Sequence, residues 1–143
     1  MNAVHGKPRS KARRIALQAL YQIEMTGDLA GVVKSQFCSD HNKQNMKGTD
    51  ITYFEELLDG IDQHRPELLA TISPVLDRSL DKLDQVEKAI LLIGSYELLH
   101  RADIPYRVSI NEGIELAKQF GATESHRYIN SILDSLAQQK KSD

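Results

Sequence analysis

This chain of 143 residues has one cysteine, no tryptophan and no long apolar run. The single cysteine, Cys38, cannot form an internal disulfide, which favours a reducing compartment. The longest apolar run, Ala89 to Ile93, is far shorter than the roughly 20 residues of a membrane-spanning helix. The N-terminus also lacks the apolar segment of a secretion signal. We therefore expect a cytoplasmic protein without a membrane segment.

Aromatic residues are few as well, with three phenylalanines in a chain that is 41% hydrophobic, so the core should be mainly aliphatic. A chain of this length is typical of one domain and buries roughly two-thirds of its unfolded surface. We expect a single domain over residues 1–143. A flexible basic arm is expected at 1–9 and a flexible tail at 139–143.

Negative charge is absent from the N-terminal segment, where no acid precedes Glu24. The whole chain carries a net charge of −2, so the part that follows the basic segment carries −7. A basic terminus on an acidic body indicates a localised anionic partner, although a solvated tail is the alternative. The cations are Lys7, Arg9, Lys11, Arg13 and Arg14.

Helical periodicity is the only strong pattern, and no alternating strand pattern or internal repeat is present. We predict an all-α fold of six to seven helices, with Pro66 starting a new turn and short, broken segments from Pro74 to Asp84. The apolar residues of 86–100 lie almost all round that helix, which predicts a central position. Expected N-caps are Ser10, Asp50, Asp84 with Glu87, and Ser109 with Glu112, and expected stops are Gly27 and Gly121.

Residue patterns for catalysis or metal binding are missing. The histidines include no i, i+4 pair, a single thiol cannot complete a structural zinc set, and no phosphate-binding glycine loop is present. Glu97, inside the central helix, is expected to be a partly buried acid paired across the bundle, with a raised pKa as the alternative. Cys38 is expected to be an unreactive thiol. We predict no enzyme, no cofactor and no metal.

The first helix has a basic, aromatic face. At 100° per residue, Ala12, Ala16 and Ala19 fall on the core side, whereas Arg14 and Tyr21 fall near the opposite pole. Cations beside an exposed ring suit single-stranded RNA, because cations contact phosphates while the ring stacks on a base. The alternative is that Tyr21 packs against a neighbouring helix.

Four segments in order resemble the NusB family of bacterial transcription antitermination factors along nearly the whole chain. They are ARRIALQALYQIE, DITYFEELLDGI, LDQVEKAILLIGSYELLHRADIPYRVSINEGIELAKQFG and ESHRYINSILDSLA. The resemblance implies two packed three-helix-type halves and no catalysis. It also implies binding to the single-stranded boxA element of nascent ribosomal RNA together with the ribosomal protein NusE. That complex would join RNA polymerase and other Nus factors and support processive transcription.

The resemblance also carries over site residues. The family's RNA-binding positions match Arg9, Lys11, Arg13, Tyr21, Gln85, Lys88 and Tyr128, and its NusE surface matches Glu87. Ser10 departs from the family, standing where many members carry arginine, while Arg14 adds a cation to the expected RNA surface. Glu87 as a capping residue and Tyr128 as the edge of a core stripe are the structural alternatives.

Two rival functions remain open. NusB-like domains also form the N-terminal part of some ribosomal RNA cytosine methyltransferases, which would require a following α/β domain. A helical protein–protein adaptor without RNA binding is the other rival. A monomer and a homodimer are both compatible with the sequence.

Overall fold

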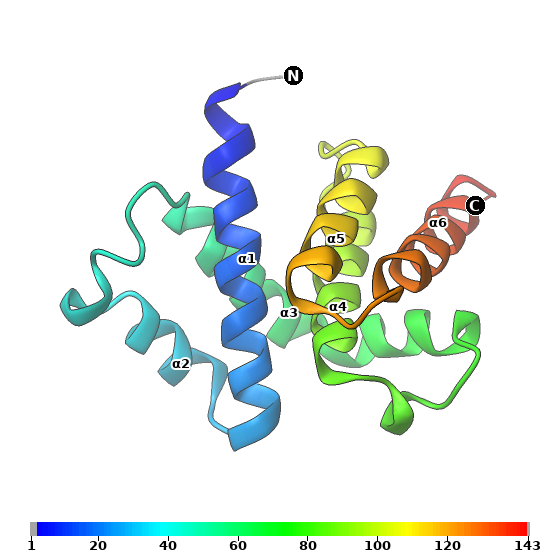
Figure 1. Ribbon diagram of the computed structural model, residues 1–143, viewed down its shortest axis with the longest axis horizontal. Coiled ribbons are helices and arrows are strands. Elements are labelled where there is room, and N and C mark those ends of the chain that lie inside the picture. The colour runs from blue at the N-terminus through cyan, green and yellow to red at the C-terminus, as the bar shows by residue number, and fades with distance from the viewer. Residues whose placement is uncertain (1–2, 143) are drawn as a thin grey trace. The chain divides into compact units, whose positions relative to one another are not determined.

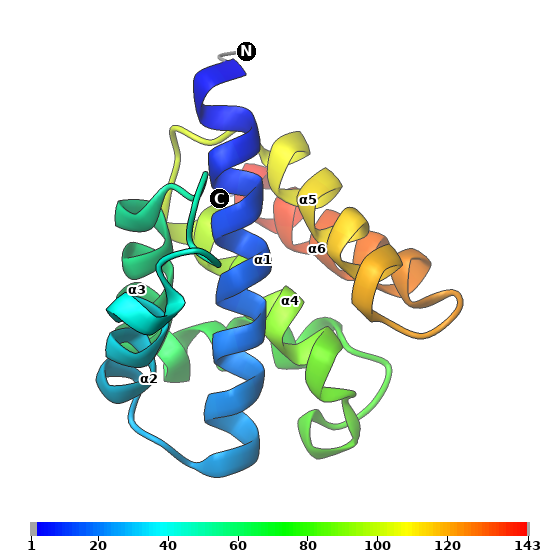
Figure 2. The ribbon, with the colours of Figure 1, turned by 60° about the vertical axis from the view of Figure 1, so that its left-hand side comes forward.

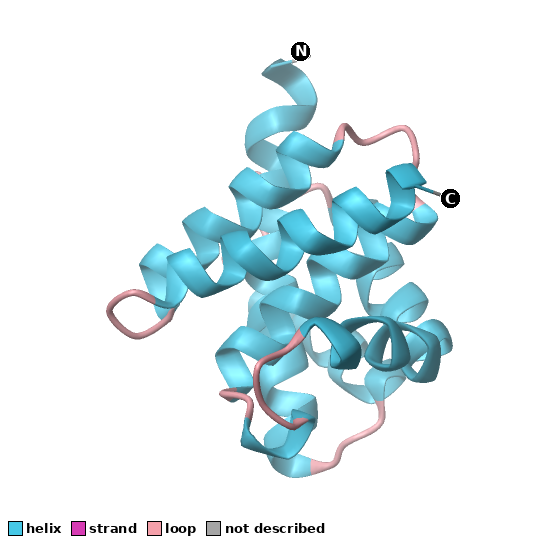
Figure 3. Ribbon diagram, turned by 90° about the vertical axis from the view of Figure 1, so that its right-hand side faces the viewer, coloured by secondary structure: helices cyan, strands magenta, loops and turns pink. Residues whose placement is uncertain are grey.

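The protein is all-α, as predicted, and its computed structural model describes residues 3–142. Within that range the regular elements are helices joined by loops (Figures 1 and 3). None of these helices has the length and apolarity to span a bilayer. The α-helices are α1 (Ala3–Thr26), α2 (Ala30–Phe37), α3 (Ile51–Ile72), α4 (Gln85–His100), α5 (Tyr106–Phe120) and α6 (Ser125–Ser142). Three short 3-10 helices are η1 (Asp40–Asn42), η2 (Ser73–Val75) and η3 (Leu80–Lys82).

The chain forms two units, Met1–Gln63 and His64–Asp143, which divide within α3. In the first unit α2 packs beside α1 (Figure 2). The Phe37 ring of α2 lies 6.0 Å from the Phe54 ring of α3, centroid to centroid. Gly27 ends α1 as expected, with a φ of 75° that favours glycine.

The second unit is built around α4, whose residues Ala89 to Leu98 are all buried. This confirms the central helix predicted from its apolar surface. Helices α5 and α6 pack on α4 and on each other. The predicted stripe of α6, Ile129, Ile132, Leu133 and Leu136, is buried.

The N-terminal helix is longer than predicted. Ser10 lies inside α1 rather than at its start, and Pro8 is also helical. Pro8 is near enough to the start of the helix that its missing N–H removes only one early backbone bond. Residues 3–9 of the expected arm and 139–142 of the expected tail are helical here. Residues 1–2 and 143 of these segments lie outside the described residues.

Two other predicted boundaries are wrong. Helix α3 continues through Pro66 to Ile72 instead of restarting there. Helix α5 begins at Tyr106, so Ser109 is not its cap but a buried residue within it. The Ser109 hydroxyl donates instead to Glu97 Oε1 at 2.8 Å. The predicted pairing of Glu97 with a neighbouring helix is confirmed, but at 1% exposure Glu97 is more deeply buried than predicted.

The predicted caps at Asp50 and Asp84 are confirmed. The backbone N–H of Tyr53 donates to Asp50 Oδ1 at 3.0 Å. Asp84 Oδ1 accepts from the N–H groups of Val86 and Glu87 at 2.9 and 3.1 Å. The reciprocal half of that cap is absent, because the Glu87 carboxylate accepts a hydrogen bond from Ser125 Oγ instead.

Removing the Asp84 cap should cost about 1 kcal/mol of unfolding free energy, because Asp84→Ala leaves two helix N–H groups without their acceptor. Urea denaturation would measure this loss. Asp84→Asn keeps an acceptor oxygen and should retain most of the stability. Asp134→Ala, on the exposed surface of α6, is the control and should change stability by less than about 0.5 kcal/mol. Equal losses for Asp84→Ala and Asp134→Ala would contradict the capping role.

Candidate nucleic-acid interface

Two of the predicted cations on α1 are held against a tyrosine of α3. The Arg9 guanidinium lies 4.9 Å from the Tyr53 ring centroid, and its Nε is 3.7 Å from Asp50 Oδ2. The Arg13 guanidinium lies 5.5 Å from the same centroid, and the residue is only 3% exposed. Arg13 therefore offers little surface to a ligand, and its predicted contact with RNA would require α1 to expose it. Arg9 is partly exposed and keeps a larger accessible edge.

The other two predicted cations, Lys11 and Arg14, line one surface pocket of about 440 Å³ in the first unit. The Lys11 ammonium donates to the backbone carbonyl of Lys47. Five amide side chains form most of the polar lining, and both donors and acceptors are present because each amide carries both. The remaining lining residues are Ile15, Gln18, Gln22, Gln36, Phe37, Asn42, Asn45 and Met46.

Part of this amide set is already ordered by internal hydrogen bonds. Gln22 Nε2 donates to the side-chain Oε1 of Gln36 at 3.1 Å, and Asn42 Nδ2 donates to the backbone carbonyl of Gln36 at 2.6 Å. The sequence did not indicate Asn42 and Asn45 as site residues, because they lie in a segment expected to be an irregular polar loop. Their proximity to α1 depends on how that loop folds back.

Tyr21 is exposed, as the helical wheel predicted. It is 41% exposed, and Met25, one turn later, is 60% exposed. An exposed aromatic ring on a helix that also carries cations is a platform on which a base can stack. The alternative expected above, in which Tyr21 is packed against a neighbouring helix, does not fit this exposure.

The start of α4 carries the predicted residues of the second unit. Gln85 Oε1 is buried and has no hydrogen-bond partner among the described residues. Glu87 Oε2 accepts from Ser125 Oγ at 2.7 Å, so its carboxylate is tied to α6. Burial, and then the nearby charge of Arg65, lower the pKa of the Lys88 ammonium. Of these three residues, Glu87 therefore makes a structural contact beside its predicted binding role.

Tyr128 is part of a small polar cluster. Its hydroxyl donates to Asp77 Oδ1 at 3.1 Å, and the Arg78 guanidinium lies 4.5 Å from its ring centroid. The Arg78 hydrogen bond, and a smaller contribution from Tyr128, hold the pKa of the Asp77 carboxyl below its usual range. Arg78 is an exposed cation that sequence reasoning missed, because it lies in the irregular segment between Pro74 and Asp84. One face of the Tyr128 ring is thus covered by Arg78.

The predicted residues therefore form two sets. Arg9, Lys11, Arg13, Arg14 and Tyr21 lie in the unit Met1–Gln63, while Gln85, Glu87, Lys88 and Tyr128 lie in the unit His64–Asp143.

Cys38 and three residues of the second unit bear on the other chemistry considered above. Cys38 is an exposed residue, but the partial burial of its sulfur raises the pKa of the thiol. A raised pKa fits the unreactive thiol expected. His64, Glu67 and His100 converge, with their ligand atoms within 4.8 Å of one another. The sequence showed no such cluster, because His100 follows Glu67 by 33 residues.

Comparison with known proteins identifies relatives along almost the whole chain. The model of the NusB family matches residues 10–138. A transcription antitermination protein NusB from Marinomonas sp. (strain MWYL1) is 50% identical over 130 residues, which cover 91% of this chain and 74% of that protein. A protein of the same name from Shewanella piezotolerans is 46% identical over 133 residues, covering 93% and 96% of the two chains.

Solved structures match as well. The structure of T. maritima NusB superposes with a TM-score of 0.77 at 28% identity, covering 96% of this chain and 99% of that chain. A crystal structure of antitermination factors NusB and NusE in complex with double-stranded RNA superposes with a TM-score of 0.80 at 23% identity. That match covers 91% of this chain and 96% of the other. At 23% identity, the match to the complex shows the fold alone.

Proposed function

Because the chain belongs to the NusB family, we propose that it is a non-enzymatic antitermination factor that binds the boxA element of nascent ribosomal RNA. In this proposal NusE is its protein partner, and the complex supports processive transcription by RNA polymerase with other Nus factors. The family relation covers 91% of the chain at 50% identity, and the related protein is named for transcription antitermination. The protein would act in the cytoplasm.

The exposed ring of Tyr21 is the observation that carries the RNA-binding proposal. It projects from the same helix as Lys11 and Arg14, which line the pocket of the first unit. Unpaired bases in single-stranded RNA can stack on such a ring, whereas bases within a duplex cannot reach it. The two cations supply the charge that phosphates require. The amides of the pocket add donors and acceptors suited to the edge of an unstacked base.

A basic ribosomal protein is a chemically suitable partner for the rest of the molecule. The chain outside its N-terminal segment carries a net charge of −7, and complementary charge speeds association and favours the correct partner. Glu87, at the start of α4, is the residue proposed to contact NusE. Its carboxylate is half-buried and already bonded to Ser125, so it would contribute through its remaining lone pairs.

Fluorescence anisotropy with a labelled boxA RNA, with and without NusE, tests this proposal. Tyr21→Ala should weaken RNA binding about 5- to 150-fold, because base stacking on an aromatic ring contributes roughly 1–3 kcal/mol. Phe120→Ala is a matched control, since Phe120 is 40% exposed but lies on α5, and it should leave the affinity unchanged. NusE should strengthen binding to boxA.

Two further RNAs make the test specific. A scrambled single strand should bind more weakly than boxA, and a duplex of the boxA sequence should respond less to Tyr21→Ala, because its bases remain stacked. Equal binding to boxA and scrambled RNA, with no response to NusE or to Tyr21→Ala, would overturn the proposal. The helical protein–protein adaptor would then be the better account.

A further inference from the structure

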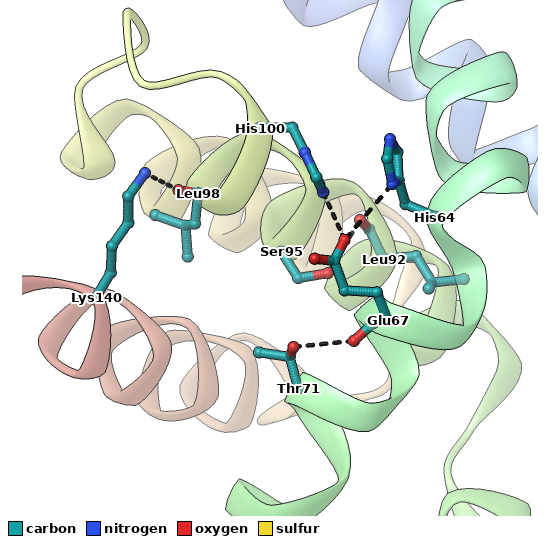
Figure 4. Close-up of polar contacts among 8 residues, drawn as sticks. All are labelled: His64, Glu67, Thr71, Leu92, Ser95, Leu98, His100 and Lys140. Carbon is teal, nitrogen blue, oxygen red and sulfur yellow. Dashed lines mark hydrogen bonds and ion pairs between the residues drawn. The ribbon is translucent and has the colours of Figure 1, made fainter. Parts of the chain in front are cut away.

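A His–Glu–His cluster joins α3 to the end of α4 within the second unit. His64 and Glu67 lie one turn apart on α3, and His100 is the last residue of α4. Both imidazoles point toward the Glu67 carboxylate (Figure 4). His100 Nε2 is 2.7 Å from Glu67 Oε1, and His64 Nδ1 is 3.5 Å from the same oxygen. The two imidazole rings stack with centroids 4.0 Å apart.

Hydrogen bonding satisfies only part of this cluster. The His100–Glu67 pair is a good hydrogen bond, but the 3.5 Å separation between His64 and the same oxygen exceeds ordinary hydrogen-bond length. The Glu67 carboxylate pairs with both of these histidines. In the tautomer that carries its proton on the other ring nitrogen, each imidazole presents a lone pair to the cluster.

We propose that His64, Glu67 and His100 bind a divalent transition-metal ion of the zinc class. Two neutral imidazoles and one carboxylate are a frequent donor set for zinc, with water completing the coordination. A divalent ion would satisfy all three groups at once, because it can accept a lone pair from each of them.

Two of the three ligand separations are close to what zinc requires, and all three are within 4.8 Å. With metal–ligand distances of about 2.0–2.1 Å and tetrahedral angles, the ligand atoms should be roughly 3.3–3.4 Å apart. The His64–Glu67 distance of 3.5 Å already fits, and the His100–Glu67 distance of 2.7 Å must open by a fraction of an ångström. The Glu67 side chain is 54% exposed and is free to rotate by that amount. Water can reach the open coordination position for the same reason.

The surroundings also favour a cation. His100 is in the last turn of α4, where the aligned peptide dipoles place partial negative charge. Tyr96 packs against the His100 ring with centroids 5.4 Å apart and limits the orientations of that imidazole. The bound ion would link α3 to α4 and stabilise the folded second unit.

Titration calorimetry with zinc chloride tests the site in untagged full-length protein carrying Cys38→Ser, which removes the thiol as a competing ligand. We expect one ion per chain and a melting temperature that rises with zinc concentration. Cobalt should bind in place of zinc and give the strong visible absorption of a low-symmetry cobalt site. His64→Ala and His100→Gln should each weaken zinc binding at least 10-fold, since even losing a group that orients a ligand costs that much.

His126→Ala is the matched control, because it removes a half-buried histidine from α6. It should leave zinc affinity and the cobalt spectrum unchanged. His100→Gln retains a hydrogen-bond donor for Glu67, and circular dichroism would verify that both ligand variants keep their helices. Absence of zinc binding, or equal binding in His64→Ala, His100→Gln and His126→Ala, would overturn the proposal. None of these outcomes depends on RNA binding.

Discussion

Replacing Leu133 by alanine should lower the free energy of unfolding by about 2–5 kcal/mol. Leu133 is fully buried on α6 and fills the space beside Gly94 of α4 and Gly113 of α5. Removing its side chain leaves a cavity that the three packed helices cannot close without moving. Urea denaturation followed by circular dichroism would measure the loss.

The stability lost in Leu133→Ala should depend on which residues stand at Gly94 and Gly113, since both lie against the Leu133 side chain. A Cβ at Gly94 would lie 2.6 Å from Leu133 Cδ2, and one at Gly113 would lie 2.8 Å from Leu133 Cδ1. Gly94→Ala alone should therefore cost about 1–3 kcal/mol through overpacking. In the double variant Gly94→Ala with Leu133→Ala, the new methyl group occupies part of the cavity, so the combined cost should fall below the sum by about 0.5–3 kcal/mol.

Gly31→Ala controls for the general effect of adding a methyl group to a helix. Nothing lies within 4 Å of a Cβ at Gly31 on α2, so this change should be neutral or stabilising by up to about 1 kcal/mol. Strictly additive costs in the Gly94 and Leu133 double variant would contradict the close packing of these helices.

Burial in the second unit was predictable because it depends on local periodicity. Helix α4 is apolar almost all round and is enclosed, and the stripe of α6 faces the core. The boundaries were less predictable, since a cap signal competes with tertiary packing. Ser109 has the spacing of a cap with Glu112, yet its hydroxyl binds Glu97 on another helix. A serine hydroxyl can satisfy either partner, and the sequence does not indicate which one is nearby.

In the candidate site too, features set by one helix were predictable, and features set by contacts between helices were not. The exposure of Tyr21 follows from its angle on α1 and was predicted. The burial of Arg13 was not, because it depends on Tyr53, which reaches Arg13 from a different helix. The His64, Glu67 and His100 cluster was also invisible, since it requires α3 and the end of α4 to meet. Contacts between helices thus account for most of what the sequence left undetermined.

Arg14→Gln should weaken RNA binding and reduce its dependence on salt. If the complex with single-stranded RNA involves about four phosphate contacts, its affinity should fall roughly 50-fold between 50 and 200 mM salt. Losing one contact should lower the slope of log affinity against log salt by about 0.7, so the same change in salt would reduce affinity only about 20-fold. Arg14 is partly exposed and lines the pocket, so its removal should leave the fold intact.

Arg13→Gln is the informative comparison, because the adjacent residue carries the same charge in a different environment. Arg13 is 3% exposed over the Tyr53 ring, so its loss should lower the free energy of unfolding while leaving the salt slope of RNA binding unchanged. Lys118→Gln, on the exposed face of α5, should change neither quantity. If Arg13→Gln reduced the salt slope of RNA binding and Arg14→Gln left it unchanged, the roles assigned to the two arginines would be reversed. The phosphate contact would then belong to the arginine that packs on Tyr53, and RNA binding would require α1 to expose it.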